Sequence, residues 1–199
     1  MEDAAAHDLP WSRRGCPLRL HQGDNRLPLN ERWRNPHWVL IRPLDPVDGP
    51  DCDQVVASLP YFFGDQEGLR RCAHAVRSQR GWVAERSTEV VGFLTVDEPF
   101  PRSPEVTWMA VRSGERGQGI GRALVERAAA ELTAHGAELL TVLTLGPSVP
   151  EPGVTDGYAG TRRFYLRCGF LCVMEFRPDG WTDVALLLVR CLRHPDAHG

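Results

Sequence analysis

The residue types and spacing best suited to chemistry lie in the segment Arg116-Gly117-Gln118-Gly119-Ile120-Gly121. An apolar run at 106–111, with β-branched and aromatic residues, precedes it and predicts a buried strand. The segment after it has apolar residues at four-residue spacing from Leu124 to Leu132 and stops at Gly136, which predicts a helix. A strand-to-helix turn presents unpaired backbone N–H groups at the positive end of the helix, and glycine lets a phosphate approach them. The sequence therefore predicts an anion-binding turn.

The spacing of these glycines distinguishes between three kinds of phosphate-binding loop. The dinucleotide fingerprint G-x-G-x-x-G fits poorly because Gly121 comes one residue early, although Glu138 lies near the distance expected for a ribose-binding acid. The nucleoside triphosphate loop needs G-K-[ST], and the chain contains no lysine. The pattern that remains is [RQ]-x-x-G-x-[GA], filled by Arg116, Gly119 and Gly121. A glycine-rich turn without a ligand is the plain alternative.

A second pattern follows downstream, at Thr161–Phe170. It is similar to the signature A-x-x-[FL]-Y-x-x-x-G-F, in which a short helix carries a tyrosine, here Tyr165, and Gly-Phe leads into the next strand. Taken alone, this tyrosine fits a packing residue at a helix–strand junction. The two patterns in this order resemble the acyl-CoA loop and the tyrosine helix of the Gcn5-related N-acetyltransferase (GNAT) superfamily, over residues 38–192.

The resemblance implies a mixed α/β fold and acetyl-CoA as cosubstrate. One domain would hold a mixed, mostly antiparallel sheet that is splayed between its fourth and fifth strands and flanked by about four helices. Acetyl-CoA would lie in that gap, between the strands at 105–111 and 139–145. Strand backbone would pair with the pantetheine amides, and N–H groups and arginines of the turn would hold the pyrophosphate. The cofactor-binding residues expected are Met109, Ala110, Val111, Arg116, Gly117, Gln118, Gly119, Gly121, Arg122 and Ala123.

Acetyl transfer to an amine needs two proton movements, and two residues are candidates for them. A lysine-like amine, with a reference pKa of about 10.4, is mostly protonated at neutral pH, so a base helps. Glu105 resembles the catalytic glutamate of the histone-acetylating branch in its spacing, and alternation would place Glu105, Thr107 and Met109 on one face. Tyr165, still protonated at neutral pH, is the candidate general acid for the thiolate. A water chain instead of Glu105, and a merely solvated glutamate, stay open as alternatives.

The acceptor amine is expected to enter from the opposite mouth of the gap. Its walls would come from Tyr61–Asp65, Asp97-Glu98 and the loop 150–158, whose acidic residues favour a cation. The family's asparagine before the tyrosine helix is missing, and Thr144, Ser148 or Thr161 would have to replace it. The substrate-binding residues expected are Tyr61, Asp97, Glu98, Trp108 and Tyr158. Two rivals remain: an acyl-CoA-binding module without turnover, and an enzyme whose acceptor is a protein amine instead of a small molecule.

Bulk properties narrow the class of protein. With 199 residues, 42% of them hydrophobic and 25% charged, the chain suits one globular domain. Six cysteines without C-x-x-C spacing argue against a metal site and fit a reduced cytoplasm. A net charge of −3 disfavours nucleic acid as a partner. Since no apolar stretch is long enough to span a membrane and the start is acidic, we expect a cytoplasmic monomer or homodimer.

The elements that must position these residues follow from periodicity and from turn residues. Residues 1–37 are expected to be an extension, 38–192 the acetyltransferase domain and 193–199 a tail. Segments 43–50 and 146–160 are expected to be loops. Strands are expected at 39–41, 82–85, 90–96, 105–111, 139–145, 170–176 and 182–192, and helices at 52–63, 67–79, 122–136 and around Tyr165.

Overall fold

The computed structural model describes residues 39–63, 66–148, 157–179 and 183–192. All of them belong to the second of two units, Pro36–Gly199. The extension and the tail expected at the two ends lie outside the described residues, as does most of the loop 150–158. The strands are β1 (Leu40–Pro43), β2 (Arg80–Arg86), β3 (Glu89–Asp97), β4 (Glu105–Val111), β5 (Leu139–Leu145), β6 (Leu171–Phe176) and β7 (Ala185–Cys191). The helices are η1 (Pro46–Asp48), α2 (Gly49–Ala57), α3 (Gln66–Ser78), η2 (Ser113–Glu115), α4 (Ile120–Ala134) and α5 (Ala159–Arg167).

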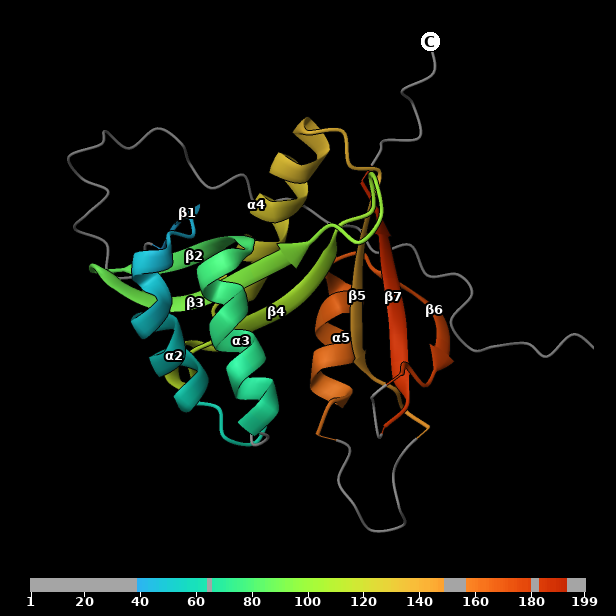
Figure 1. The fold of residues 1–199 in the computed structure, drawn as a ribbon, viewed down its shortest axis with the longest axis horizontal. Helices are drawn as coiled ribbons and strands as arrows, with labels where there is room; N and C mark the ends of the chain where they lie inside the picture. Colours follow the sequence, from blue (N-terminus) through green and yellow to red (C-terminus); the bar gives the residue numbers. More distant parts are fainter. Residues whose placement is uncertain (1–38, 64–65, 149–156, 180–182, 193–199) are drawn as a thin grey trace, which may run out of the picture. The chain divides into compact units, whose positions relative to one another are not determined.

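The described strands form one seven-stranded sheet in the order β1-β2-β3-β4-β5-β7-β6. Every neighbouring pair is antiparallel except β4 and β5, which are parallel. These two strands pair only at Glu105–Thr141 and Val106–Val142, and beyond these positions they diverge (Figure 1). The predicted fold class is confirmed: a mixed, mostly antiparallel sheet splayed between its fourth and fifth strands, with four α-helices in the described residues.

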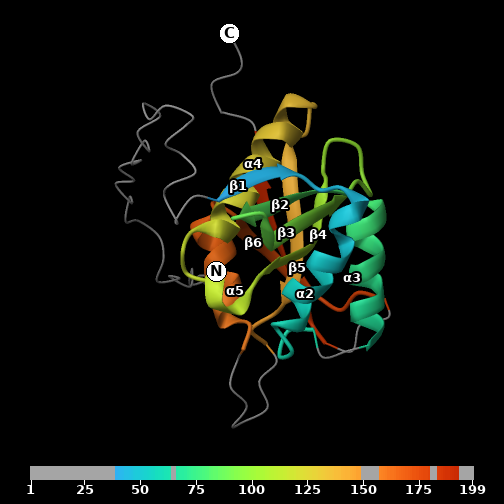
Figure 2. The same cartoon turned by 90° about the vertical axis from the view of Figure 1, so that its left-hand side faces the viewer.

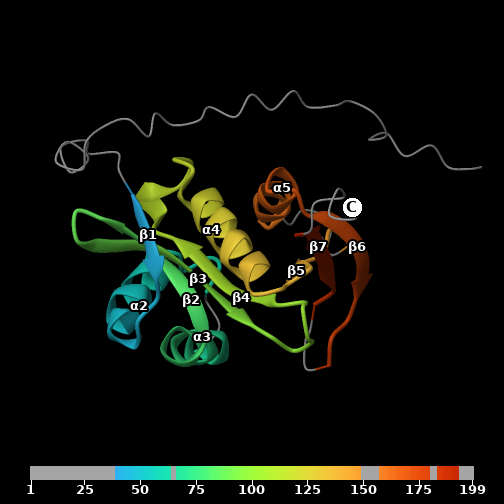
Figure 3. The ribbon, with the colours of Figure 1, turned by 90° about the horizontal axis from the view of Figure 1, so that it is seen from above.

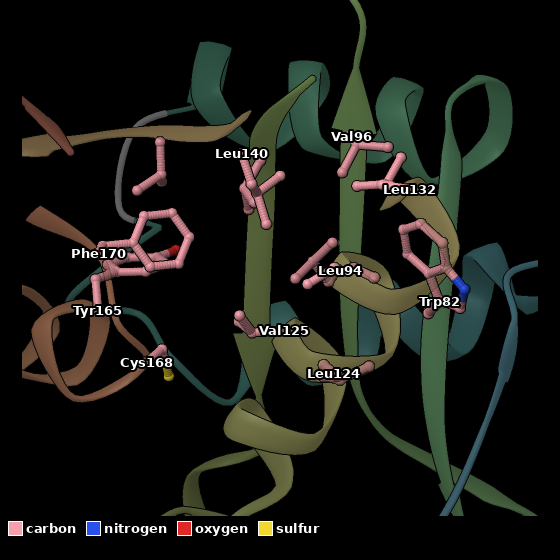
Figure 4. Packing of buried hydrophobic residues seen from close by; sticks show 14 of the residues in the cluster. Trp82, Leu94, Val96, Leu124, Val125, Leu132, Leu140, Tyr165, Cys168 and Phe170 are labelled. Carbon is pink, nitrogen blue, oxygen red and sulfur yellow. The ribbon is translucent and has the colours of Figure 1, made fainter. Parts of the chain in front are cut away.

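Helices cover both faces of the sheet and create two apolar cores. Figures 2 and 3 show α2 and α3 on one side of β1–β4 and α4 on the other, with α5 on the side of α4. The first core joins α4 and α5 to the sheet and includes Leu94, Leu124 and Phe170 (Figure 4). The second core joins α2 and α3 to the opposite face and includes Val55 and Phe93. Adjacent β3 residues Phe93 and Leu94 are both fully buried in different cores, so this strand is apolar on both faces.

The segment after β1 differs from the sequence-based prediction. The expected loop 43–50 contains η1, where the Asp45 side chain caps the turn by accepting from Val47 N–H at 3.0 Å. Helix α2 then begins at Gly49 and ends at Ala57, whereas a helix over 52–63 was expected. Pro60 explains the early end, because proline has no N–H to donate and disfavours helical geometry at the residue before it. Residues 58–63 therefore form turns that lead toward the gap.

A β-bulge in β4 changes which side chains share a face. Thr95 pairs with Trp108 and Val96 pairs with Val106, so Thr107 has no partner of its own on β3. Thr107 Oγ1 donates to Gln79 Oε1 at 2.6 Å, at the end of α3, and lies 2.8 Å from Thr95 Oγ1. Met109 instead packs against the first core, on the side of α4. The expectation that Glu105, Thr107 and Met109 share one face is therefore wrong for Met109, because a bulge breaks strict alternation.

Candidate active site

The divergence of β4 and β5 opens a cavity of about 1340 Å³. Its walls come from β4, β5, α3, the start of α4 and α5, so that residues far apart in the sequence face one space. On the side of β4 that faces β5, the ladder stops at Val106. The backbone from Thr107 to Val111 therefore presents an unpaired strand edge to the cavity, and such an edge can pair with an extended ligand.

The glycine-rich turn forms the entrance to α4 at one end of this cavity. Gly117 and Gly119 have φ values of 78° and 84°, and a Cβ added to either would meet nothing within 4 Å. Glycine is therefore required at both positions because the backbone is left-handed there, and not because neighbouring atoms leave too little space for a side chain. Gly119 is the N-cap of α4, and no side chain caps it. The first N–H groups of α4 are thus left open at the positive end of the helix dipole.

Two details of the turn differ from the expectation. The N–H of Ala123 donates to the carbonyl oxygen of Gly119 at 3.0 Å, so it closes the first turn of α4 and is not an open donor. Ile120, which the sequence-based assignment omitted, lies in the uncapped first turn and lines the cavity. A Cβ on Gly121 would lie 3.2 Å from Phe164 Cε2 and 3.3 Å from Met109 Cε. Gly121 therefore lets α4 approach α5 and β4 closely.

Tyr165 lies on α5 between the first core and the cavity. It is only 5% exposed, and its ring makes an edge contact with Phe164 at a centroid distance of 5.1 Å. A second edge contact, with Phe170, has a centroid distance of 5.3 Å (Figure 4). Helix α5 ends at Arg167, and two residues later Gly169 adopts a φ of 83°, which lets Phe170 N–H donate back to the Tyr165 carbonyl at 3.1 Å. Burial raises the pKa of the Tyr165 phenol well above its ordinary value. The phenol therefore stays protonated across the physiological range.

Glu105 lies at the start of β4, where β4 and β5 still pair, and it also lines the cavity. Burial is the main cause that raises the pKa of this carboxyl, and the negative charge of Asp97 raises it further. Asp97 is opposite Glu105 in the β3–β4 ladder, which explains this influence. A carboxylate with a raised pKa is a better proton acceptor than an ordinary glutamate.

An aromatic wall borders the cavity near the segment 58–63. The Phe62 ring makes edge contacts with Tyr61 at 5.3 Å and with Tyr158 at 5.4 Å. The Arg116 guanidinium carbon lies 5.0 Å from the centroid of the same ring. This segment is therefore packed against both the glycine-rich turn and the start of α5.

The predicted site residues fall into two groups. Those that line the cavity are Glu105, Trp108, Met109, Ala110, Val111, Arg116, Gly117, Gly119, Gly121, Arg122, Tyr158 and Tyr165. Those that are not among its lining residues are Tyr61, Asp97, Glu98, Gln118 and Ala123. Tyr61 is 66% exposed, and Asp97 Oδ1 accepts the Glu98 N–H at 2.9 Å at the end of β3. Of the residues considered as replacements for the missing asparagine, Thr144 and Thr161 line the cavity, whereas Ser148 donates to the Glu175 carboxylate.

Sequence reasoning missed the wall that α3 contributes. Glu67, Arg71 and His74 line the cavity, and their spacing of four and then three residues places them on one face of α3. That spacing was visible in the sequence, but nothing in it indicated that this polar face borders a cavity. Asp183, which precedes β7, was missed as well.

The described ranges contain neither a metal-ligand cluster nor a membrane-spanning helix. No group of three or more His, Cys, Asp or Glu side chains there is arranged to hold a metal ion. None of the helices in the same part of the chain is long and apolar enough to cross a membrane.

The splayed sheet and the uncapped glycine-rich turn at the head of α4 together define the GNAT class of fold. Comparison with known families agrees: the family described as "Acetyltransferase (GNAT) domain" matches residues 77–171. Residues 77–171 therefore match the GNAT acetyltransferase domain, and the sheet that contains them has the fold of the same class. No curated protein sequence matches the chain.

Solved structures show the same fold at low sequence identity. An acetyltransferase assigned to the GNAT family from Desulfovibrio desulfuricans matches with a TM-score of 0.67 and 22% identity, over 78% of this chain and 100% of that one. The ribosomal-protein-S18-alanine N-acetyltransferase from Escherichia coli matches with a TM-score of 0.62 and 15% identity, over 81% of this chain and 99% of that one. An aminoglycoside 6′-N-acetyltransferase in complex with coenzyme A matches with a TM-score of 0.61 and 18% identity, over 79% and 99%.

Proposed function

We propose that this protein transfers an acetyl group from acetyl-CoA to an amine by direct attack of the amine on the thioester. One observation carries the proposal: a single cavity is bordered by the uncapped start of α4, the open edge of β4, Glu105 and Tyr165. The similarity to an aminoglycoside acetyltransferase solved with coenzyme A supports the choice of cofactor. Direct attack is favoured because Cys168, which is among the cavity-lining residues, is buried, and burial raises the pKa of its thiol.

The residues present fit the chemical groups of acetyl-CoA. The open N–H groups in the first turn of α4 and the side chains of Arg116 and Arg122 suit the pyrophosphate, because they combine oriented donors with positive charge. The β4 backbone from Thr107 to Val111 suits the pantetheine amides, which can bind as an additional strand. When bound, the cofactor supplies the activated acetyl group and a thiolate as leaving group.

Glu105 is the proposed base. Its carboxylate accepts a proton from the ammonium form of the acceptor, directly or through water, and its raised pKa improves that capacity. The carboxylate of Asp183 borders the same cavity and favours a cationic acceptor. The carboxylate of Glu67 is already paired with Arg70 at 2.6 Å, and Arg71 borders the cavity as well.

Tyr165 is the proposed group that stabilises the thiolate. A thiol has a reference pKa of about 8.5, whereas burial raises the pKa of this phenol well above the ordinary tyrosine value of about 10. Complete proton transfer from phenol to thiolate is therefore unfavourable. We infer that Tyr165 donates a strong hydrogen bond to the sulfur as the C–N bond forms and the C–S bond breaks. The attacking nitrogen then loses its second proton to solvent, and solvent protonates the thiolate.

Titration calorimetry followed by a thiol-release assay tests this function. We expect acetyl-CoA to bind with micromolar affinity, and CoA release to depend on an added amine from a panel of small amines and peptide α-amines. Failure of the folded protein to bind acetyl-CoA would exclude the proposal. Tight binding without turnover on any amine would instead identify an acyl-CoA-binding module.

A further inference from the structure

Arg86, at the end of β2, reaches the glycine-rich turn and binds two of its side chains. Its Nη1 donates to the Glu115 carboxylate, and Nη1 and Nη2 both donate to Gln118 Oε1, at 3.0 and 3.1 Å. Gln118 Nε2 in turn donates to Glu115 Oε2 at 3.2 Å and to the Gly114 carbonyl at 3.4 Å. Arg86, Glu115 and Gln118, which we call the Arg86 clasp, form a closed ring of hydrogen bonds.

The Arg86 clasp holds the part of the turn between Gly117 and Gly119. Gln118 lies between Gly117 and Gly119, and added Cβ atoms at both glycines would meet nothing within 4 Å, so neighbouring groups do not confine the backbone there. No side chain caps the start of α4 either. Glycine has the largest conformational freedom of all residues, so an unrestrained turn would lose much entropy on binding a ligand. The Arg86 clasp removes part of that conformational freedom before the ligand binds.

The Arg86 clasp also changes the charge that a ligand meets. Glu115 lines the cavity next to the turn, and a bare carboxylate there would repel a phosphate group. The Arg86 guanidinium neutralises it, and with side chains only 17% and 23% exposed, water screens this pair little. The hydrogen bonds of the Arg86 guanidinium to Glu115 and Gln118 come from its two terminal nitrogens, whereas Arg86 Nε is buried without a hydrogen-bond partner in the described structure.

We propose that Arg86 is a positioning residue for the pyrophosphate of the cofactor: it fixes the turn through Gln118 and cancels the charge of Glu115. This inference rests on the proposed function, since it assumes that the turn binds a pyrophosphate. Arg86 itself is not among the residues that line the cavity, so it acts through its two partners.

The experiment compares two ligands that differ in the pyrophosphate. Acetyl-CoA carries it, and S-acetylpantetheine has the same thioester arm without it. For Arg86→Gln we expect the Kd of acetyl-CoA, measured by calorimetry, to rise about tenfold. The Kd of S-acetylpantetheine, measured by NMR titration, should stay within twofold of the wild-type value. In a variant that is only misfolded, the Kd values of both ligands would rise equally, and that result would overturn the inference.

A second substitution separates charge from positioning. Adding Glu115→Gln to Arg86→Gln removes the bare carboxylate, so we expect this double variant to recover part of the lost acetyl-CoA affinity. Arg77→Gln is the matched control, because Arg77 also forms an ion pair, with Asp53 at 2.6 Å, but on α2 and α3 away from the turn. Wild-type protein that does not bind acetyl-CoA would refute the proposed function and this inference together. Wild-type binding with an unchanged Kd in Arg86→Gln would refute only the role of Arg86.

Discussion

Thr107 and Met109 face opposite sides of the sheet, although they are two residues apart on one strand. The β-bulge at Thr107 breaks the alternation, so that Thr107 is hydrogen-bonded to Gln79 on the side of α3. Met109 packs on the other side, where its Cε lies 3.3 Å from the Cβ position of Gly121. The bulge therefore lets one strand contribute side chains to the α3 wall of the cavity and to the packing of the glycine-rich turn.

Replacement of Tyr165 by phenylalanine removes the hydroxyl and keeps the ring in its aromatic contacts. We expect kcat to fall about 10²-fold, because the thiolate loses its hydrogen-bond donor, with little change in the Kd of acetyl-CoA. Steady-state kinetics and calorimetry measure the two effects. Tyr61→Phe is the control, since Tyr61 is exposed and does not line the cavity. Undiminished kcat in Tyr165→Phe would show that the phenol has no part in the reaction.

Gly119 and Gly136 offer a matched pair at the two ends of α4. Their φ values are 84° and 90°, and added Cβ atoms would meet nothing within 4 Å at either position. We expect each alanine variant to lose roughly 1–2 kcal/mol of unfolding free energy from left-handed backbone strain. Thermal unfolding measures this loss.

The same pair tests the location of the cofactor. Only Gly119→Glu should abolish acetyl-CoA binding, because its carboxylate would stand at the open N–H groups. Gly136→Glu, roughly 25 Å away beyond the other end of the helix, should bind normally in calorimetry. Equal binding by the two glutamate variants would contradict a phosphate site at the head of α4.

The ionisation of Glu105 should make activity fall at acidic pH. The base must be ionised, so kcat/KM should fall as the pH drops through the raised pKa of this carboxyl. In Glu105→Gln we expect this acidic limb to disappear and kcat/KM at neutral pH to fall about 10²-fold. A pH–rate profile of both proteins measures the difference. If the acidic limb persists unchanged in the variant, it reports the ionisation of another group and not of Glu105.

The same carboxyl should lower stability at neutral pH. Because its pKa is raised on folding, the folded protein binds the proton more tightly than the unfolded chain, and stability falls as the pH rises between the two pKa values. We therefore expect Glu105→Gln to have a higher Tm than wild type at pH 7 and an equal one at pH values below the unfolded pKa. Calorimetric scans at several pH values check this, and a lower Tm at pH 7 would contradict it.

The thiols of this protein should differ in reactivity. Burial raises the pKa of Cys52 and of Cys72 to about 12, and Cys168 is buried as well. Cys172 and Cys191 are exposed. In the native state at pH 8 we expect an alkylating reagent to label these two cysteines within minutes and to label the buried ones only on unfolding. Peptide mass mapping distinguishes the labelled cysteines, and equal labelling of Cys52 and Cys172 would be evidence against the burial of Cys52 in the second core.

Local patterns were sufficient for much of the fold. The apolar run of β4, the helix α4 and its termination just before Gly136 follow from periodicity and from glycine geometry, which depend on neighbours in the sequence. Helix α2 ends earlier than its apolar pattern predicts, because Pro60 interrupts the helix before the apolar residues 61–63. The bulge at Thr107 left no signal in β4 alone, since it depends on how two strands pair.

For the site, the sequence alone determined the glycine-rich turn and the tyrosine helix, because both are local backbone geometries that a few residue types specify. Only the tertiary structure decided which side chains border one cavity. It brought α3 with Glu67, Arg71 and His74 to the gap, left Asp97 and Glu98 outside the cavity lining, and joined Arg86 to Gln118. These relationships depend on packing between segments far apart in the chain, and a pattern along one segment carries no information about which distant segment it will meet.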